Sequence, residues 1–227
     1  MANPIYLTSD EYARVSAAVS AAESGTSGEI VTVLAERSDG YSDVAMAWAA
    51  AATLAALVAL SVAPDFYLGL FERLTGGWMS EWTPREIFEL AALVAVLKFG
   101  GMLLIQLWKP LKYFLVPGPI RTARVHERAV RAFRIGAERR THGRTGVLIY
   151  LSMREHRAEI LADEAIASKV APEMWGDAMI ALLAEVKQGR VADGMIAAIE
   201  RVGAVLTEHF PAGSENPNEL PDRLIEV

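Results

Sequence analysis

The most constraining feature of the sequence is an uncharged apolar run from Val44 to Ala63. At a rise of about 1.5 Å per residue, a helix of this length matches a hydrocarbon core roughly 30 Å thick. A second apolar stretch of spanning length, Ile87 to Trp108, contains only Glu89 and Lys98 as charged residues. The two stretches predict a transmembrane hairpin.

The segment between the two spans, residues 64–86, is rich in ring side chains, which favour the headgroup level of a bilayer. We expect a loop on the membrane surface, with a turn at Gly76-Gly77. Its ring-bearing residues are Phe66, Tyr67, Phe71, Trp78 and Trp82.

Basic residues predict the orientation of the hairpin. The segment after the second span, residues 109–144, has ten basic and two acidic residues, a net charge of +8, whereas the loop has only Arg73 and Arg85 as basic residues. The positive-inside rule therefore places both termini and the soluble domain in the cytoplasm of a multi-pass membrane protein. Residues 1–10 lack a basic start followed by an apolar core, so we expect no cleavable signal peptide.

Lys98 lies near the middle of the second span and has two interpretations. It is either a buried cation for ion passage or a lysine that snorkels or contacts a neighbouring helix, and the second is favoured because two helices enclose no pathway. Small residues permit close helix contact, so a homo-oligomer is possible. They are Ala47, Ala51, Ala55 and the pair Gly100-Gly101.

The rest of the chain predicts one α/β domain in two pieces, with residues 1–43 before the hairpin (44–110) and residues 111–227 after it. Thr8 and Glu11 have the spacing of a capping box, and a helix follows as far as Gly25. The apolar, β-branched run Ile30–Ala35 predicts a strand that is buried on both faces. Cysteine is absent, which excludes a disulfide framework and thiolate chemistry.

The second piece predicts a helix after Pro117-Gly118-Pro119, ending at 141–143, and then a buried strand over 146–151. A long crossover containing a helix makes this strand parallel to the first. A third strand at 158–163 follows too short a turn for a crossover and is expected to be antiparallel. Helices at 173–188 and 193–208 close the domain, and the tail from Pro211 to Val227 is expected to be irregular.

Together these stretches resemble the bacterial membrane-anchored branch of the TPM-domain family. The resemblance covers essentially the whole chain and implies an α/β/α sandwich with a short mixed sheet, interrupted by the transmembrane hairpin, in the bacterial inner membrane. In that family, a plant relative has been assigned acid phosphatase activity, and some members bind divalent cations. The resemblance therefore implies phosphatase activity and divalent cation binding as expectations for this chain. The stretches that carry the resemblance are Ser27–Val31, Tyr41–Asp43, Gly143–Ser152, Glu159–Asp163, Asp193–Met195, Phe210-Pro211 and Asn218–Pro221.

Acidic residues at one end of the predicted sheet are the candidates for metal-assisted chemistry. Asp163, Glu164 and Glu29 should lie at the end opposite the carboxyl end of the first strand, and carboxylate oxygens are the ligands that Mg²⁺ and Ca²⁺ prefer. Such a metal could polarise a phosphoryl oxygen, with Asp163 and Glu164 as metal ligands or acid/base groups. The alternative is that these are ordinary charges at strand and helix ends.

The basic block suggests a different role. Arg121, Arg124 and Arg128 are candidates for binding anionic lipid headgroups, although the block also serves as a topology signal. No recognition motif or interleaved aromatic residues accompany the charge, so no nucleic-acid partner is expected. The four dispersed histidines, and the lack of a P-loop or a serine elbow, argue against zinc, nucleotide and serine-hydrolase chemistry.

Two function classes follow. The first is an interaction or assembly module on the cytoplasmic face of the membrane, with an unknown protein partner and no required cofactor. The second is a divalent-metal-assisted phosphatase. The first is favoured because the sequence shows no nucleophile or complete ligand set, and whether the chain is an enzyme is left open.

Overall fold

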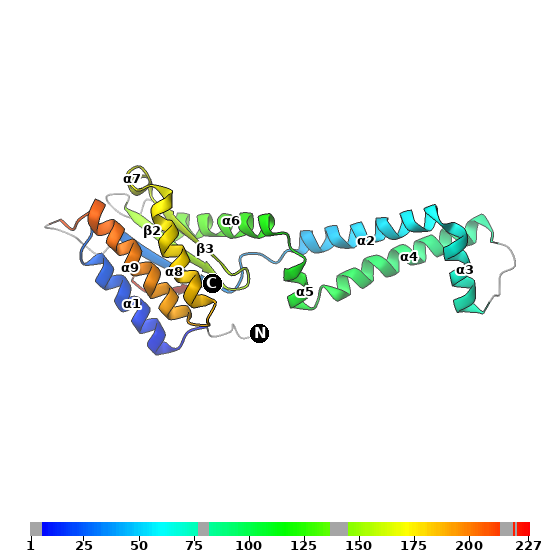
Figure 1. Ribbon diagram of the computed structural model, residues 1–227, viewed down its shortest axis with the longest axis horizontal. Helices are drawn as coiled ribbons and strands as arrows, with labels where there is room; N and C mark the ends of the chain where they lie inside the picture. Colours follow the sequence, from blue (N-terminus) through cyan, green and yellow to red (C-terminus); the bar gives the residue numbers. More distant parts are fainter. Residues whose placement is uncertain (1–5, 77–81, 137–144, 214–219, 221) are drawn as a thin grey trace. The chain divides into compact units, whose positions relative to one another are not determined.

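The computed structural model describes residues 6–76, 82–136, 145–213, 220 and 222–227 (Figure 1). The chain divides into two compact units. One combines residues 1–39 with residues 118–227, and the other comprises Gly40–Pro117.

The first unit is a mixed α/β domain, as predicted. Its elements follow the chain in the order α1 (Ser9–Glu23), β1 (Glu29–Ala35), α6 (Gly118–Gly136), β2 (Gly146–Ser152), β3 (Arg157–Ala162), α7 (Glu164–Ala167), η1 (Pro172–Trp175), α8 (Gly176–Val186), α9 (Val191–His209) and β4 (Ile225–Glu226).

The sheet has the strand order β3-β2-β1-β4. β1 pairs in parallel with β2 from Glu29 opposite Gly146 to Ala35 opposite Ser152, and β2 pairs with β3 in antiparallel fashion. Both predicted pairings are therefore confirmed. Every residue of β1 and β2 is buried, as expected for strands covered on both faces.

Alternate residues of β1 face two different cores. Ile30 and Leu34 join the core beneath α1, α8 and α9, whereas Val31 and Val33 join a smaller core beneath α6. Helices therefore cover both faces of the sheet, and the predicted α/β/α sandwich is confirmed. On its other face the sheet is covered by one long helix, α6. This face is therefore covered less completely than the face beneath α1, α8 and α9.

The first helix begins as the sequence predicts. The Thr8 hydroxyl accepts a hydrogen bond from the Glu11 amide at 3.3 Å, and the Glu11 carboxylate accepts one from the Thr8 amide at 2.7 Å. This capping box satisfies amide groups that the first helical turn leaves without partners.

The tail differs from the prediction of an irregular segment, because Ile225–Glu226 forms β4. Val33 pairs with Ile225, the Val227 amide donates to the Leu34 carbonyl at 3.0 Å, and the Glu36 amide donates to the Val227 carbonyl at 3.0 Å. The available edge of β1 imposes strand structure on a short segment whose own pattern does not predict it. The predicted helix end at 141–143 lies outside the described residues.

The second unit contains α2 (Ser42–Val62), α3 (Pro64–Thr75), α4 (Pro84–Ile105) and α5 (Lys109–Phe114). The most apolar 18-residue windows of α2 and α4 have a mean hydropathy of 2.0, and both helices are long and apolar enough to cross a membrane. They run side by side within the unit, where the Gln106 side-chain amide donates to the Ala45 carbonyl at 3.1 Å (Figure 1).

Much of the predicted loop between the spans is helical. Pro64 occupies the first turn of α3, where a missing amide hydrogen has no cost, and Gly76 ends the helix with a left-handed φ of 87°. The aromatic residues gave the expectation of a loop, but three of them, Phe66, Tyr67 and Phe71, are part of α3. Gly77, the second residue of the predicted turn, lies outside the described residues.

Candidate functional site: a polar cleft at the carboxyl end of β1

Asp163 and Glu164 lie where β3 passes into α7. The Asp163 carboxylate accepts a hydrogen bond from the Glu164 amide at 3.2 Å and so caps α7, while its own amide donates to the Gly146 carbonyl at 2.9 Å. Asp163 is buried and Glu164 is exposed. The cap gives the Asp163 carboxylate a structural role at a helix start.

Glu29 lies at the same end of the sheet, opposite Gly146 on the neighbouring strand. Its buried carboxylate accepts a hydrogen bond from the Leu220 amide at 3.0 Å. Gly146 therefore has Glu29 on one side and Asp163 on the other, so the structure brings two of the three acidic candidates to one edge. Within the described ranges, no three His, Cys, Asp or Glu side chains are grouped to hold a metal ion.

A further buried carboxyl group, Glu23, lies beside this edge. Its Oε1 accepts a hydrogen bond from the Ile30 amide at 2.7 Å, and its Oε2 is buried without a hydrogen-bond partner in the part of the chain described. Burial, together with the nearby charges of Glu29 and Asp222, raises the pKa of Glu23 to about 8. This carboxyl group is therefore protonated at neutral pH, which makes it a poor ligand for a cation.

A polar cleft of about 260 Å³ lies at the opposite, carboxyl end of β1. In open α/β sheets this is the end at which ligands bind. Three arginines reach the cleft from α6, because spacings of four and three residues place them on one helix face. The lining residues are Ser38, Asp39, Arg124, Glu127, Arg128 and Arg131.

The three arginines are in different electrostatic situations. Arg124 Nε lies 3.0 Å from an Asp39 carboxylate oxygen, and its guanidinium also lies 3.5 Å from Glu127. Arg128 and Arg131 are exposed, and neither forms an ion pair with a carboxylate among the described residues. The cleft therefore has two guanidinium groups without a carboxylate partner among the described residues, and Arg128 also interacts with the Tyr150 hydroxyl.

Below the arginines, hydroxyl groups and one carboxylate form a buried network. Ser38 Oγ donates to Ser152 Oγ at 2.9 Å and lies 3.1 Å from the Tyr150 hydroxyl. The Ser152 hydroxyl donates in turn to the buried Glu155 carboxylate, which also accepts from the Ser38 amide at 3.2 Å. Burial raises the pKa of the Tyr150 phenol, against the opposing influence of Ser38 and Arg128, so Tyr150 is neutral.

The arginine candidates divide between two places. Arg124 and Arg128 line the cleft, but Arg121 does not, and its Nε is buried without a hydrogen-bond partner within the described ranges. Reasoning from the sequence assigned no site role to Arg131 or to the network of Ser38, Tyr150, Ser152 and Glu155. The i+3 spacing from Arg128 to Arg131 and the position of Ser38 after a central strand were the signals that could have found them.

Comparisons with known proteins support the α/β fold. Residues 120–205 match the model of the TPM domain. The structure of the BA42 protein from the psychrophilic bacterium Bizionia argentinensis has a TM-score of 0.55 and 19% identity, with 97% of this chain and 95% of that chain covered. No curated protein matches.

Proposed function

Because the chain carries a TPM domain, we propose that it is a membrane-anchored interaction module whose soluble domain binds an anionic group in the arginine cleft. The observation that supports this function best is the exposed pair Arg128 and Arg131 at the carboxyl end of β1. A guanidinium group binds phosphate or carboxylate through two parallel hydrogen bonds, which gives both affinity and orientation. The partner would carry such a group.

The anchor in this proposal is the pair α2 and α4. Only 17% and 6% of their most apolar windows are buried, whereas the core helix of a soluble protein would be mostly buried. Apolar surface of this extent needs an apolar solvent or a partner. We propose a bilayer, with the chain crossing it twice and the soluble domain on the cytoplasmic side of the inner membrane.

The hydroxyl network supports a second candidate function, phosphoric-ester hydrolysis. Ser38, Ser152 and Glu155 form a chain of two hydroxyls and a carboxylate beneath the arginines, an arrangement in which a base can polarise a hydroxyl group. The arginines would hold the phosphoryl group above it. This candidate differs from the metal-assisted site expected at Asp163 and Glu164, and one assay can test both.

The binding proposal is tested by calorimetric titration of the full chain, in nanodiscs of phosphatidylcholine, with glycerol 3-phosphate. We expect the double variant Arg128→Gln/Arg131→Gln to bind at least about ten-fold more weakly, since a hydrogen bond to a charged group contributes roughly 1.5–3 kcal/mol. The control Lys187→Gln/Arg201→Gln removes two exposed cations, one at the C-terminal cap of α8 and one on α9, and should bind as the parent does. Equal affinity in the two double variants would contradict the proposal.

The hydrolase candidate is tested by phosphate release from a panel of phosphomonoesters, with Mg²⁺, Ca²⁺ or chelator. Turnover that disappears in Ser152→Ala but survives in Asp163→Asn/Glu164→Gln would locate the chemistry at the carboxyl end of β1. The reverse result, with metal dependence, would locate it at Asp163 and Glu164. Turnover equal in all variants, or absent, would exclude both hydrolase sites and leave the interaction module.

A further inference from the structure

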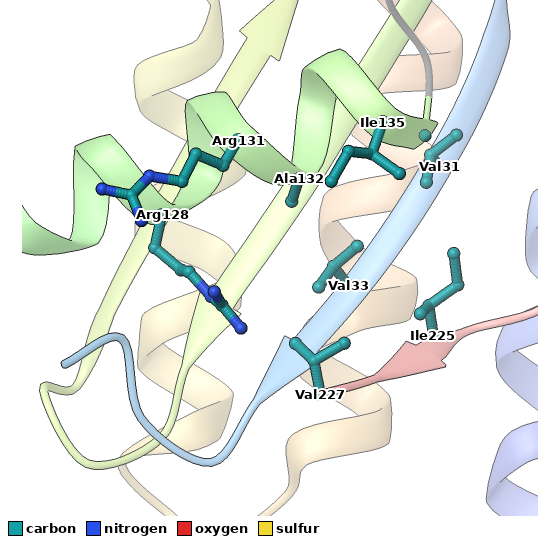
Figure 2. Close-up of a pocket in the computed structure, with 9 residues that line it drawn as sticks. Val31, Val33, Arg128, Arg131, Ala132, Ile135, Ile225 and Val227 are labelled. Carbon is teal, nitrogen blue, oxygen red and sulfur yellow. The ribbon is translucent and has the colours of Figure 1, made fainter. Parts of the chain in front are cut away.

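An apolar groove of about 190 Å³ adjoins the polar cleft on the α6 face of the sheet. Figure 2 shows Val31 and Val33 of β1, Ile225 of β4 and Val227 beside it, and Ala132 and Ile135 of α6 around this groove. Ile135 and Val227 are 69% and 47% exposed, so the groove is open at its rim. It exists because one helix, α6, covers this face and packs mainly against β2 and β3.

The groove and the cleft share Arg128 and Arg131. In Figure 2 the side chain of Arg128 extends from α6 toward the carboxyl end of β1 and the side of Val33 and Val227, whereas that of Arg131 extends along α6, away from the valines. One surface therefore has an apolar part and a cationic part that meet at two exposed guanidinium groups. A ligand that matches it has an apolar tail joined to an anionic head.

We propose that this surface binds a single-chain anionic lipid, with its acyl chain in the groove between α6 and β4 and its headgroup on Arg128 and Arg131. This inference rests on the proposed function and specifies its ligand. The headgroup chemistry is a phosphate or carboxylate, which guanidinium groups bind in bidentate fashion.

The size of the groove favours one chain rather than two. Pockets that enclose a drug-sized ligand measure roughly 300–1,000 Å³, and this groove is smaller. Its apolar walls are formed by β-branched side chains of two strands, which move little, and by short side chains of α6. Part of one acyl chain fits such a space, whereas a diacyl lipid would leave its second chain in water.

The position of the cleft in the chain favours a ligand drawn from the bilayer. Asp39 stands three residues before Ser42, where the apolar helix α2 begins. Three residues reach at most about 11 Å. The proposed anchor α2 therefore follows the cleft directly in the sequence, so the ligands at the highest local concentration are those of a bilayer.

The test uses the full chain in phosphatidylcholine nanodiscs and monoacyl glycerol 3-phosphate with a photoreactive diazirine at the end of its acyl chain. After irradiation, mass spectrometry measures labelling of peptides from β1, α6 and β4, relative to peptides from α2 and α4 that any dissolved lipid can reach. Ile135→Glu places a charge in the groove. Its matched control is Ile180→Glu on α8, where the side chain is 68% exposed against 69% for Ile135.

We expect Ile135→Glu to lower labelling of the groove peptides about ten-fold, because the loss of roughly two buried methylene groups weakens binding by about that factor. Ile180→Glu should leave the labelling unchanged. Unlabelled monoacyl glycerol 3-phosphate should compete, and monoacyl phosphocholine of the same chain should compete at least ten-fold less. Labelling confined to α2 and α4, or equal in both variants, would overturn the inference.

Competition by glycerol 3-phosphate as strong as by the lipid would also overturn the inference, because the acyl chain would then contribute nothing. In that case the arginine cleft would still bind its anion and the proposed function would stand. Failure of glycerol 3-phosphate to bind the parent chain would instead remove the proposed function itself.

Discussion

At the scale of single residues, the buried carboxyl group of Glu23 has a measurable consequence. Its ordinary pKa of 4.5 rises to about 8 in the folded domain, chiefly through burial. The folded state therefore keeps a proton that the unfolded chain releases at lower pH. The stabilising contribution is complete below about pH 4.5 and is lost as the pH rises through 8.

We therefore expect the free energy of unfolding of the α/β domain to fall between about pH 5 and pH 9, and Glu23→Gln to reduce that slope. The amide keeps an oxygen for the Ile30 amide but cannot ionise. Thermal midpoints across this range, followed by circular dichroism, measure the effect. The control is Glu208→Gln, which removes an exposed carboxylate on α9. If the stability of the parent fell with pH no more steeply than that of Glu23→Gln, the prediction would be refuted.

Residue identity revealed part of the candidate site but not its arrangement. Arg124 and Arg128 could be singled out from charge alone, because their segment is strongly basic. Charge and composition could not single out Ser38, Ser152 and Glu155, because serine and glutamate occur throughout the chain. Their grouping depends on the turn that joins β2 to β3. Pairing across the sheet, rather than any local pattern, brings these side chains together.

At the scale of elements, close approach between helices depends on two glycines of α9. A Cβ atom at Gly203 would lie 2.7 Å from the Ala22 Cβ of α1, and one at Gly194 would lie 2.7 Å from the Leu182 carbonyl oxygen of α8. Real side chains do not approach so closely, so the helices would have to separate. These glycines set the spacing of the three-helix layer.

Gly203→Ala should therefore destabilise the domain by about 1–3 kcal/mol, the usual cost of overpacking. Gly176→Ala at the start of α8 meets nothing within 4 Å and should be neutral or slightly stabilising, because alanine favours helix. Chemical denaturation of both variants gives the comparison. If Gly203→Ala matched Gly176→Ala in stability, the separation of α1 and α9 would not depend on this glycine.

Long periodic elements were predictable from the sequence, and short ones were not. The capping box of α1 and the buried runs of β1 and β2 carry strong local signals. β4 has only two residues, which is too short for a recognisable pattern. The aromatic residues of α3 are equally typical of a loop at a membrane interface, so they do not predict a helix. Pairing with the neighbouring strand β1 determines the structure of β4, and Gly76 determines where α3 ends.

At the scale of the whole molecule, the orientation of the proposed anchor follows from the distribution of basic residues. A reporter enzyme fused after Gly76 is expected to behave as extracytoplasmic, whereas the same reporter fused after Val227 is expected to be cytoplasmic. Alkaline phosphatase and a fluorescent protein, which are active on opposite sides of a bacterial inner membrane, measure this. Cytoplasmic behaviour of the Gly76 fusion would reverse the proposed topology.

The parallel pairing of β1 has a consequence for how the chain is made. β1 leaves the ribosome before either apolar helix, but its partners are β2 and Ile225–Glu226, which come much later in the chain. At about 5–20 residues per second, the first partner follows after roughly 5–20 s and the second after roughly 10–40 s. During that interval β1 has no sheet to join, although the whole of the proposed hairpin has already been made. In the proposed topology, the anchor is therefore complete before the domain can fold.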